Sequence, residues 1–288
     1  MERAEHKRVV LGGLNVHYVQ AGQGPVVLLL HGLGTSLVTW SRNIEPLAAA
    51  GFTVLAPDLP GHGDSDKPPH LSYDPVDGAR LIHQFLQSLG VARVSLVGNS
   101  AGGLVVGLFA LSHPEKVERL VLVASGGLGR RVSWFLRFFS LPILGDLFYQ
   151  PQLQNATDFS KRIFYQAPPF LDEVLAEMYR VRALPGARRA GLRAIRSSIN
   201  FLGLRQHRYI LPRLKQLPVP LLTVWGREDN IIPVSHARLV RQELPHSVVR
   251  IMPQCGHWPH MEKAEQFNDL LIRFLRGALH DGISPAGL

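Results

Sequence analysis

The stretch LVGNSAGG, residues 96–103, places one serine between glycines directly after an apolar run. Gly98 and Gly102 stand two residues on either side of Ser100, which is the pattern G-x-S-x-G. Where a strand turns sharply into a helix, this spacing lets the neighbouring backbone pass without a Cβ clash while the serine hydroxyl is held clear of the sheet. An ordinary tight turn could use the same letters, so the surrounding sequence has to decide between the two.

Apolar runs of strand length alternate with stretches of helical spacing along most of the chain. The runs PVVLLLHG (residues 25–32) and RVSLVG (93–98) are apolar almost throughout, as expected for strands covered on both faces. This alternation predicts an α/β fold with a mostly parallel sheet and ligands outside the carboxyl ends of the strands. The predicted strands are residues 14–20, 25–32, 52–58, 93–98, 119–125, 219–226 and 247–253.

The alternation fails in one long segment. From residue 129 to about residue 213 the chain has aromatic and Arg-rich stretches of helical spacing, such as LDEVLAEMYRVRA (171–183), and no buried-strand run. We therefore predict a core formed by residues 1–128 and 214–288, interrupted by a helical insertion at 129–213.

A serine hydroxyl is a poor nucleophile unless a base accepts its proton and a third group orients that base. His257 lies in a Gly- and Pro-rich loop after the last predicted strand, and Asp229 follows the strand at 219–226. Both therefore belong to the same sheet edge as Ser100, and the order Ser, Asp, His suits this architecture. We predict a triad of Ser100, Asp229 and His257, with Glu228 directed elsewhere.

A tetrahedral intermediate needs two N–H donors where its oxyanion forms. The amide of Ala101 follows the nucleophile directly, and the turn HGLG (residues 31–34) offers the amide of Leu33, with His31 bracing the loop. Ala101 and Leu33 are therefore the predicted oxyanion hole. The residues predicted to contact substrate are Gly32, Gly34, Asn99, Trp134, Phe138 and Trp258.

Composition narrows the protein class. The chain has 288 residues, 46% of them hydrophobic and 18% charged, so it can fill a core. Its one cysteine, Cys255, excludes an internal disulfide framework.

No signal peptide or membrane-spanning apolar run is evident, so we expect a cytoplasmic protein. The histidines form no spaced ligand set and GLGTS lacks the lysine of a phosphate loop, so we expect no metal and no cofactor.

The formal net charge of +9 is confined to one region. Residues 128–213 hold 14 Lys and Arg against 5 Asp and Glu, whereas the rest of the chain holds 17 of each sign. No nucleic-acid-binding motif accompanies this excess, so we expect no nucleic-acid partner. Two interpretations stay open for the basic and aromatic residues 130–139: the aromatic side chains line an acyl pocket, or the segment contacts anionic lipid at a membrane surface.

The chain resembles the α/β-hydrolase superfamily. The motifs that carry the resemblance are, in order, LLLHGLG, VLAPDLPGHGDSDKP, LVGNSAGG, GREDNIIP and CGHWPHMEKAEQFN. The resemblance implies an α/β-hydrolase fold with a mostly parallel eight-stranded sheet, and a helical cap (residues 129–213) folded over Ser100. It also implies that Asp58, His62 and Asp64 form a structural turn rather than part of the chemistry.

The resemblance leaves the substrate open. A serine at the elbow disfavours dehalogenase and epoxide hydrolase chemistry, which use aspartate there. The main expectation is a carboxylesterase or lipase acting on a small-molecule ester. The alternative is carbon–carbon bond hydrolysis of meta-cleavage products, because CGHWPH and Asn43 look like that subgroup, although GLGTS departs from its oxyanion loop. That reaction needs a cap arginine, for which Arg188, Arg189 and Arg193 are candidates. A non-catalytic receptor is disfavoured because all three triad residues are present.

Overall fold

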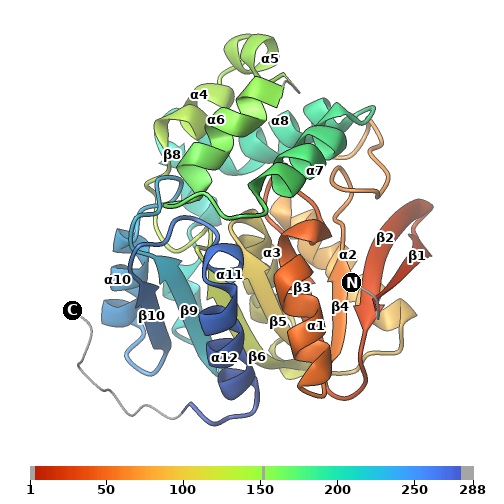
Figure 1. The fold of residues 1–288 in the computed structure, drawn as a ribbon, viewed down its shortest axis with the longest axis vertical. Helices are drawn as coiled ribbons and strands as arrows, with labels where there is room; N and C mark the ends of the chain where they lie inside the picture. Colours follow the sequence, from red (N-terminus) through yellow and green to blue (C-terminus); the bar gives the residue numbers. More distant parts are fainter. Residues whose placement is uncertain (1–3, 151–152, 280–288) are drawn as a thin grey trace.

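The computed structural model describes residues 4–150 and 153–279. Its centre is an eight-stranded sheet in the order β1-β2-β4-β3-β5-β6-β9-β10 (Figure 1). The strand β2 pairs antiparallel with both β1 and β4, and the remaining neighbours pair in parallel. The predicted α/β-hydrolase fold class, with its mostly parallel sheet, is confirmed. The strands are β1 (Glu5–Leu11), β2 (Leu14–Ala21), β3 (Val26–Leu30), β4 (Thr53–Pro57), β5 (Val94–Asn99), β6 (Val117–Val123), β9 (Leu221–Gly226) and β10 (Val248–Met252).

One strand was not among those predicted. Strand β1 pairs along its whole length with β2, and its side chains are largely exposed. Its mixture of charged and apolar residues, EHKRVVL, belongs to an edge strand with one face toward solvent. The run therefore lacks the continuous apolar character by which the buried strands were predicted.

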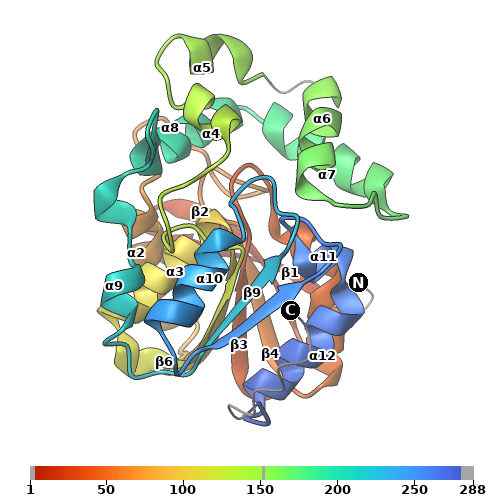
Figure 2. The same cartoon turned by 90° about the vertical axis from the view of Figure 1, so that its left-hand side faces the viewer.

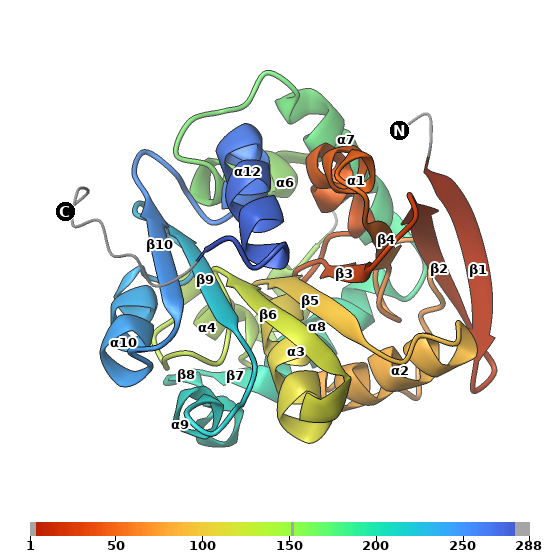
Figure 3. The same ribbon diagram turned by 90° about the horizontal axis from the view of Figure 1, so that it is seen from below.

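Helices cover both faces of the sheet (Figure 3). On one face lie α1 (Ser41–Ala49) and α12 (Ala264–Leu275); on the other lie α2 (Pro75–Ser88), α3 (Ala101–Ser112) and α10 (Ser235–Glu243). Two short helices, α9 (Leu211–Leu214) and α11 (Pro259–Glu262), and the 3-10 turns η1 (Leu37–Trp40), η2 (Pro114–Lys116) and η3 (Gln206–Arg208) complete the core.

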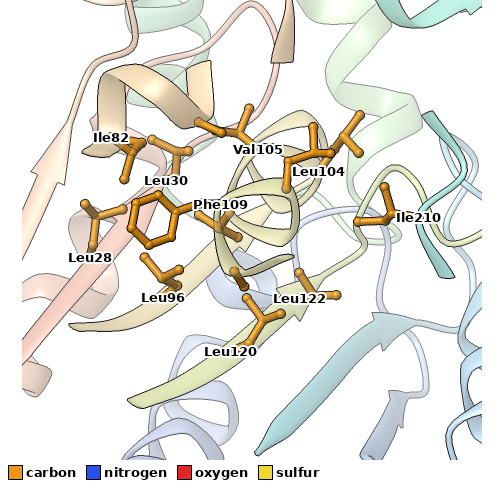
Figure 4. Packing of buried hydrophobic residues seen from close by; sticks show 14 of the residues in the cluster. Leu28, Leu30, Ile82, Leu96, Leu104, Val105, Phe109, Leu120, Leu122 and Ile210 are labelled. Carbon is orange, nitrogen blue, oxygen red and sulfur yellow. The ribbon is translucent and has the colours of Figure 1, made fainter. Parts of the chain in front are cut away.

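The two faces have separate apolar cores because side chains alternate along each strand. In β3, Val27 and Leu29 belong to the cluster with α1 and α12, whereas Leu28 and Leu30 belong to the cluster with α2 and α3. All four are fully buried. Figure 4 shows Phe109 of α3 beside Leu30 and Leu96 in the second cluster. These cores fix the strand ends from which the site is built.

Between β6 and β9 the chain forms a separate layer that lies above one end of the strands (Figures 1 and 2). This layer contains α4 (Trp134–Phe139), α5 (Leu144–Phe148), α6 (Leu153–Ile163), α7 (Leu171–Ala183) and α8 (Ala187–Ser198). It also contains a pair of two-residue strands that the sequence did not predict, β7 (Ile199–Asn200) and β8 (Gly203–Leu204). We refer to these elements as the cap; the boundaries at residues 129 and 213 stay a prediction.

No helix in the described ranges is long and apolar enough to cross a membrane.

Candidate active site

Ser100 lies at the sharp turn between β5 and α3, in a backbone conformation that few non-glycine residues adopt. Its φ is 55° and its ψ is −117°. The turn is held by backbone hydrogen bonds: the Ser100 amide donates to Val123 O at 3.0 Å, and Ser100 O accepts from Gly126 N at 2.9 Å. The surrounding structure therefore imposes a strained conformation on this serine, which is a common feature of functional sites.

The glycines around Ser100 are required by close backbone contacts. A Cβ atom at Gly98 would lie 2.5 Å from Gly102 O, and one at Gly102 would lie 2.3 Å from His31 O. A Cβ at Gly103 would lie 2.4 Å from the hydroxyl of Ser125. The glycine-rich stretch is therefore the strand-to-helix elbow rather than an ordinary surface turn.

Asp229 and His257 form a buried pair. His257 Nδ1 lies 2.7 Å from Asp229 Oδ2, and the other carboxylate oxygen accepts from the amides of Ile231 at 2.8 Å and Ile232 at 3.0 Å. These bonds fix the carboxylate, and the carboxylate orients the imidazole with Nδ1 as donor. Glu228 points elsewhere and accepts from the Cys255 amide at 2.9 Å.

The loop that carries the second predicted oxyanion donor is braced from within. His31 Nε2 accepts from the Leu59 amide at 3.1 Å, so Nδ1 carries the proton and donates to Gly32 O at 2.8 Å. Burial lowers the pKa of His31, in keeping with this neutral form. Thr35 Oγ1 also donates to Gly32 O at 2.9 Å. Leu33 and Ala101 both line the cavity that contains Ser100.

Asp58 ties this loop to the core. Its Oδ1 accepts from the Leu37 amide at 2.7 Å, and its Oδ2 lies 2.8 Å from His17 Nδ1 and accepts from the Asp64 amide at 3.0 Å. Burial would raise the pKa of Asp58, but the bond to His17 and the nearby His31 outweigh burial and lower it. Ligand atoms of His17, Asp58 and Asp64 lie within 4.8 Å of one another, yet these contacts already engage them in a structural turn, so we assign no metal here.

A cavity of about 370 Å³ opens over Ser100 between the core and the cap. Ser100, Ala101 and His257 lie in its wall. Most of the remaining wall is apolar and includes Leu14, Leu33, Leu59, Leu81, Leu104, Val105, Leu136, Ile195, Leu204, Ile231 and Trp258. The cavity is therefore shaped to hold an apolar group beside the serine.

The charged groups at this cavity are paired with one another or with the cap. Arg80 contacts Asp77 at 2.7 Å, and Asp74 contacts Arg208 of η3. The three cap arginines expected to hold a substrate carboxylate lie elsewhere. Arg188 lines a second cavity, Arg193 donates to Leu71 O at 2.8 Å and to Pro69 O, and Arg189 is not part of either described cavity wall.

The residues predicted to contact substrate divide into two groups. Gly32 and Trp258 line the cavity with Ser100, and Gly34 lines the second cavity. The other three do not line either cavity. Asn99, Trp134 and Phe138 therefore lie outside the described walls of both cavities, and a substrate contact at these three residues stays a prediction.

The surroundings of these three side chains differ. The Asn99 amide is fully buried and donates to Val123 O at 3.1 Å and His257 O at 3.3 Å, so it braces the histidine loop from below. Trp134 is 62% exposed, and its ring lies 5.6 Å from the guanidinium of Arg162. Phe138 packs its ring against Phe139 and Phe148. The helical pattern of residues 134–139 gave no indication of which face the core would cover.

The second cavity measures about 190 Å³ and lies beside the first. The two cavities share Leu33, His62, Leu136 and Ile195 in their walls. Arg182 donates from Nε to Gly34 O at 3.1 Å, and Arg188 donates from Nε to Tyr149 O at 3.0 Å. The oxyanion loop is therefore in direct contact with the cap.

A further contact joins the cap to the same loop and was missed from the sequence. Ser36 donates to Glu177 Oε1 of α7 at 2.8 Å, and Arg180 Nε donates to Glu177 Oε2 at 2.7 Å. Arg180 also binds both oxygens of Asp64, at 2.7 and 3.0 Å. We call this set Ser36, Glu177, Arg180 and Asp64 the cap latch. Ser36 and Asp64 are far in the chain from Glu177 and Arg180, so no local pattern indicated the contact across the cap boundary.

Comparison with known proteins agrees with this geometry. The family model described as alpha/beta hydrolase fold matches residues 25–264. The chain belongs to the α/β-hydrolase fold family. The matched range contains the elbow, the Asp229 and His257 loops and the whole cap, so the resemblance inferred from the motifs is confirmed.

Relatives of this α/β hydrolase align over nearly the full chain. This chain is 30% identical to the 2-hydroxy-6-oxo-6-phenylhexa-2,4-dienoate hydrolase of Burkholderia cepacia, and the alignment covers 92% of each chain. Among solved structures, a bacterial membrane phospholipase A is 30% identical with a TM-score of 0.82, covering 95% of this chain and 86% of that one. The 2-hydroxy-6-oxo-6-phenylhexa-2,4-dienoate hydrolase of Rhodococcus sp. strain RHA1 is 26% identical with a TM-score of 0.80, covering 95% and 99%.

Proposed function

We propose that this α/β hydrolase cleaves carboxylic esters with an uncharged, apolar acyl group, using Ser100 as nucleophile. The observation that carries the proposal is the apolar cavity with Ser100, Ala101, Leu33 and His257 in its wall. Its volume of about 370 Å³ falls within the range of small-molecule sites.

The geometry supports acyl transfer in two steps. Ser100 Oγ attacks the acyl carbonyl carbon while His257 takes the hydroxyl proton, and Asp229 stabilises the imidazolium. The amides of Ala101 and Leu33 donate to the oxyanion. His257 then gives its proton to the leaving alcohol, and the acyl group remains as an ester on Ser100. A water molecule, activated by His257, releases the acid and restores the serine.

The second candidate is hydrolysis of a carbon–carbon bond next to a ketone. The names of the curated relatives favour this reaction over ester hydrolysis, because several are hydrolases of 2-hydroxy-6-oxo dienoates. A dienoate carries a carboxylate, which needs a cationic partner when it is removed from water. In the described wall of the cavity, Arg80 is paired with Asp77 and Asp74 is paired with Arg208, so the wall offers no unpaired arginine or lysine to a carboxylate. This distribution of charge favours the neutral ester.

A direct comparison of substrates tests the choice. The wild-type protein is assayed with p-nitrophenyl esters of increasing acyl length and with a vinylogous 1,5-diketone acid, and Ser100→Ala serves as the control for each. We expect a higher kcat/KM for the esters, rising with acyl length until the cavity is full. A higher kcat/KM for the diketone acid would replace the ester proposal with the second candidate, and equal rates for wild type and Ser100→Ala would refute both.

A further inference from the structure

The cap carries most of the exposed large apolar side chains in the described part of the chain. Ten large apolar or aromatic side chains are exposed, and all but Val10 lie within the cap segment. Seven of them form what we call the outer cap face. Its members are Trp134, Ile143, Leu144, Leu147, Phe148, Phe201 and Leu202.

Two members of the outer cap face, Phe148 and Phe201, contact residues of α4. The ring of Phe138 on α4 lies 5.7 Å from that of Phe148 on α5. The guanidinium of Arg137, also on α4, lies 5.6 Å from the ring of Phe201 in the turn between β7 and β8. Figures 1 and 2 show α5 at the end of the cap farthest from the sheet, with α4 between α5 and the core. Exposed apolar surface of this extent marks an interaction site.

Cationic groups lie among the apolar side chains of this face. The guanidinium of Arg162 lies 5.6 Å from the ring of Trp134, and Arg137 lies beside Phe201. Asp146 on α5 contacts Arg196 at 2.7 Å, so its charge is already balanced. The complementary partner is therefore both apolar and anionic.

We propose that the outer cap face docks on an anionic lipid surface, with its apolar side chains in the interfacial layer and Arg137 and Arg162 near the lipid phosphates. An interfacial layer offers acyl chains and negative charge together, which matches this combination of side chains. The same elements reach the catalytic cavity from their inner side, since Leu136 of α4 and Leu204 of β8 lie in its wall. Docking thus brings the cavity close to the lipid. The inference concerns binding and goes beyond the reaction proposed at Ser100.

Vesicle sedimentation tests the proposal without depending on catalysis. The full chain carrying Ser100→Ala is mixed with vesicles of phosphatidylcholine alone or with about 30 mol% phosphatidylglycerol. We expect at least about tenfold tighter binding to the anionic vesicles, lost at high salt because screening weakens surface attraction. No binding, or equal binding to both vesicles, would overturn the proposal.

Substitutions in the outer cap face test whether this face is the surface that binds the vesicles. Phe201→Ser with Leu202→Ser, and separately Ile143→Ser with Leu147→Ser, are expected to weaken binding about tenfold. Val10→Ser removes an apolar side chain that is 64% exposed on β1, outside the cap, and serves as the matched control. Arg137→Gln with Arg162→Gln should remove the preference for anionic vesicles. Circular dichroism confirms that each variant is folded.

Two further results would refute the assignment. If Val10→Ser weakens binding as much as the cap variants do, the outer cap face is not the binding surface. If size-exclusion chromatography shows a stable dimer that the cap variants convert to a monomer, the face is covered by a second copy of the chain instead.

Discussion

Ser100 is held in a conformation that its own side chain does not favour, with a φ of 55°. Backbone strain of this kind costs free energy and persists only where the surroundings fix the backbone. Here the fixing groups are the neighbouring strand and the glycines at 98, 102 and 103, whose Cβ positions are occupied by other atoms. The close backbone contacts that require glycine at these positions also hold Ser100 in its strained conformation, with the residue in the wall of the cavity.

Removal of the hydroxyl gives the first prediction. Ser100→Ala should lower kcat by about 10³-fold or more, because nucleophile, base and acid act as a unit. Its folding should be unchanged, since alanine fits the same space. Steady-state kinetics with a p-nitrophenyl ester and a thermal melt measure the two effects. Near-normal turnover would show that another residue is the nucleophile.

The elbow glycines give the second prediction. Gly98→Ala should lower the free energy of unfolding by about 1–3 kcal/mol, because the new methyl group meets the backbone oxygen of Gly102. Gly126→Ala is the matched control, since a Cβ there meets its nearest atom at 3.5 Å, an ordinary contact. Urea unfolding of both variants provides the measurement. Equal losses would mean that the close contact is not the cause.

At this scale the positions of the predicted triad residues could be inferred from the sequence, whereas their surroundings could not. Ser100, Asp229 and His257 follow strand ends, and strand ends of a parallel sheet meet at one edge, so their proximity could be inferred. The environment of Asn99 could not, because its partners Val123 O and His257 O are backbone atoms on other strands and loops. The exposure of Trp134 depends on how the cap packs, which no local pattern encodes.

At the scale of elements, helix α7 connects the cap to the oxyanion loop. Glu177 binds Ser36 of that loop, and Arg180 joins Glu177 to Asp64. The loop residue Ser36 belongs to GLGTS, residues 32–36, which also contains the predicted oxyanion donor Leu33. The strands were predictable from their apolar runs, but these contacts were not, since each joins segments far apart in the chain.

The cap latch gives the third prediction. Glu177→Ala should lower kcat about threefold to tenfold, because small displacements of the oxyanion donors weaken transition-state binding. The melting temperature should change little, since partly exposed ion pairs contribute little stability. Glu173→Ala, an exposed position on the same helix, is the control.

A double-mutant cycle separates the latch from a general effect of the substitution. Ser36→Ala and Glu177→Ala remove the two ends of one hydrogen bond, so their effects on kcat should not add. If the double variant shows the full product of the two single effects, Ser36 and Glu177 act independently and the latch does not position the loop.

On the scale of the whole molecule, several histidines are buried in neutral form. Burial lowers the pKa of His236 to about 4 and, together with the nearby His31, lowers that of His62 to about 3. Burial and the neighbouring His257 place the pKa of His260 well below its usual value. In the unfolded chain each of these groups takes up a proton near pH 6.5. The unfolded state therefore binds more protons in mildly acidic solution.

This imbalance gives the fourth prediction. The free energy of unfolding should fall as the pH drops from about 6.5 toward 4, because protons bound only by the unfolded chain favour it. His236→Gln should reduce the drop in melting temperature between pH 7 and pH 5, since one of the titrating groups is gone. His246→Gln, at an exposed position, should leave the drop unchanged. An identical drop in wild type and His236→Gln would contradict this explanation.

The order of the strands has a consequence for biosynthesis. Ser100 and both predicted oxyanion donors come before the cap, whereas Asp229 and His257 follow β9 and β10, which join the sheet beside β6. A nascent chain that has emerged only as far as the cap contains the serine without its predicted base. We therefore expect the newly made protein to be inactive until its final strands have left the ribosome and joined the sheet.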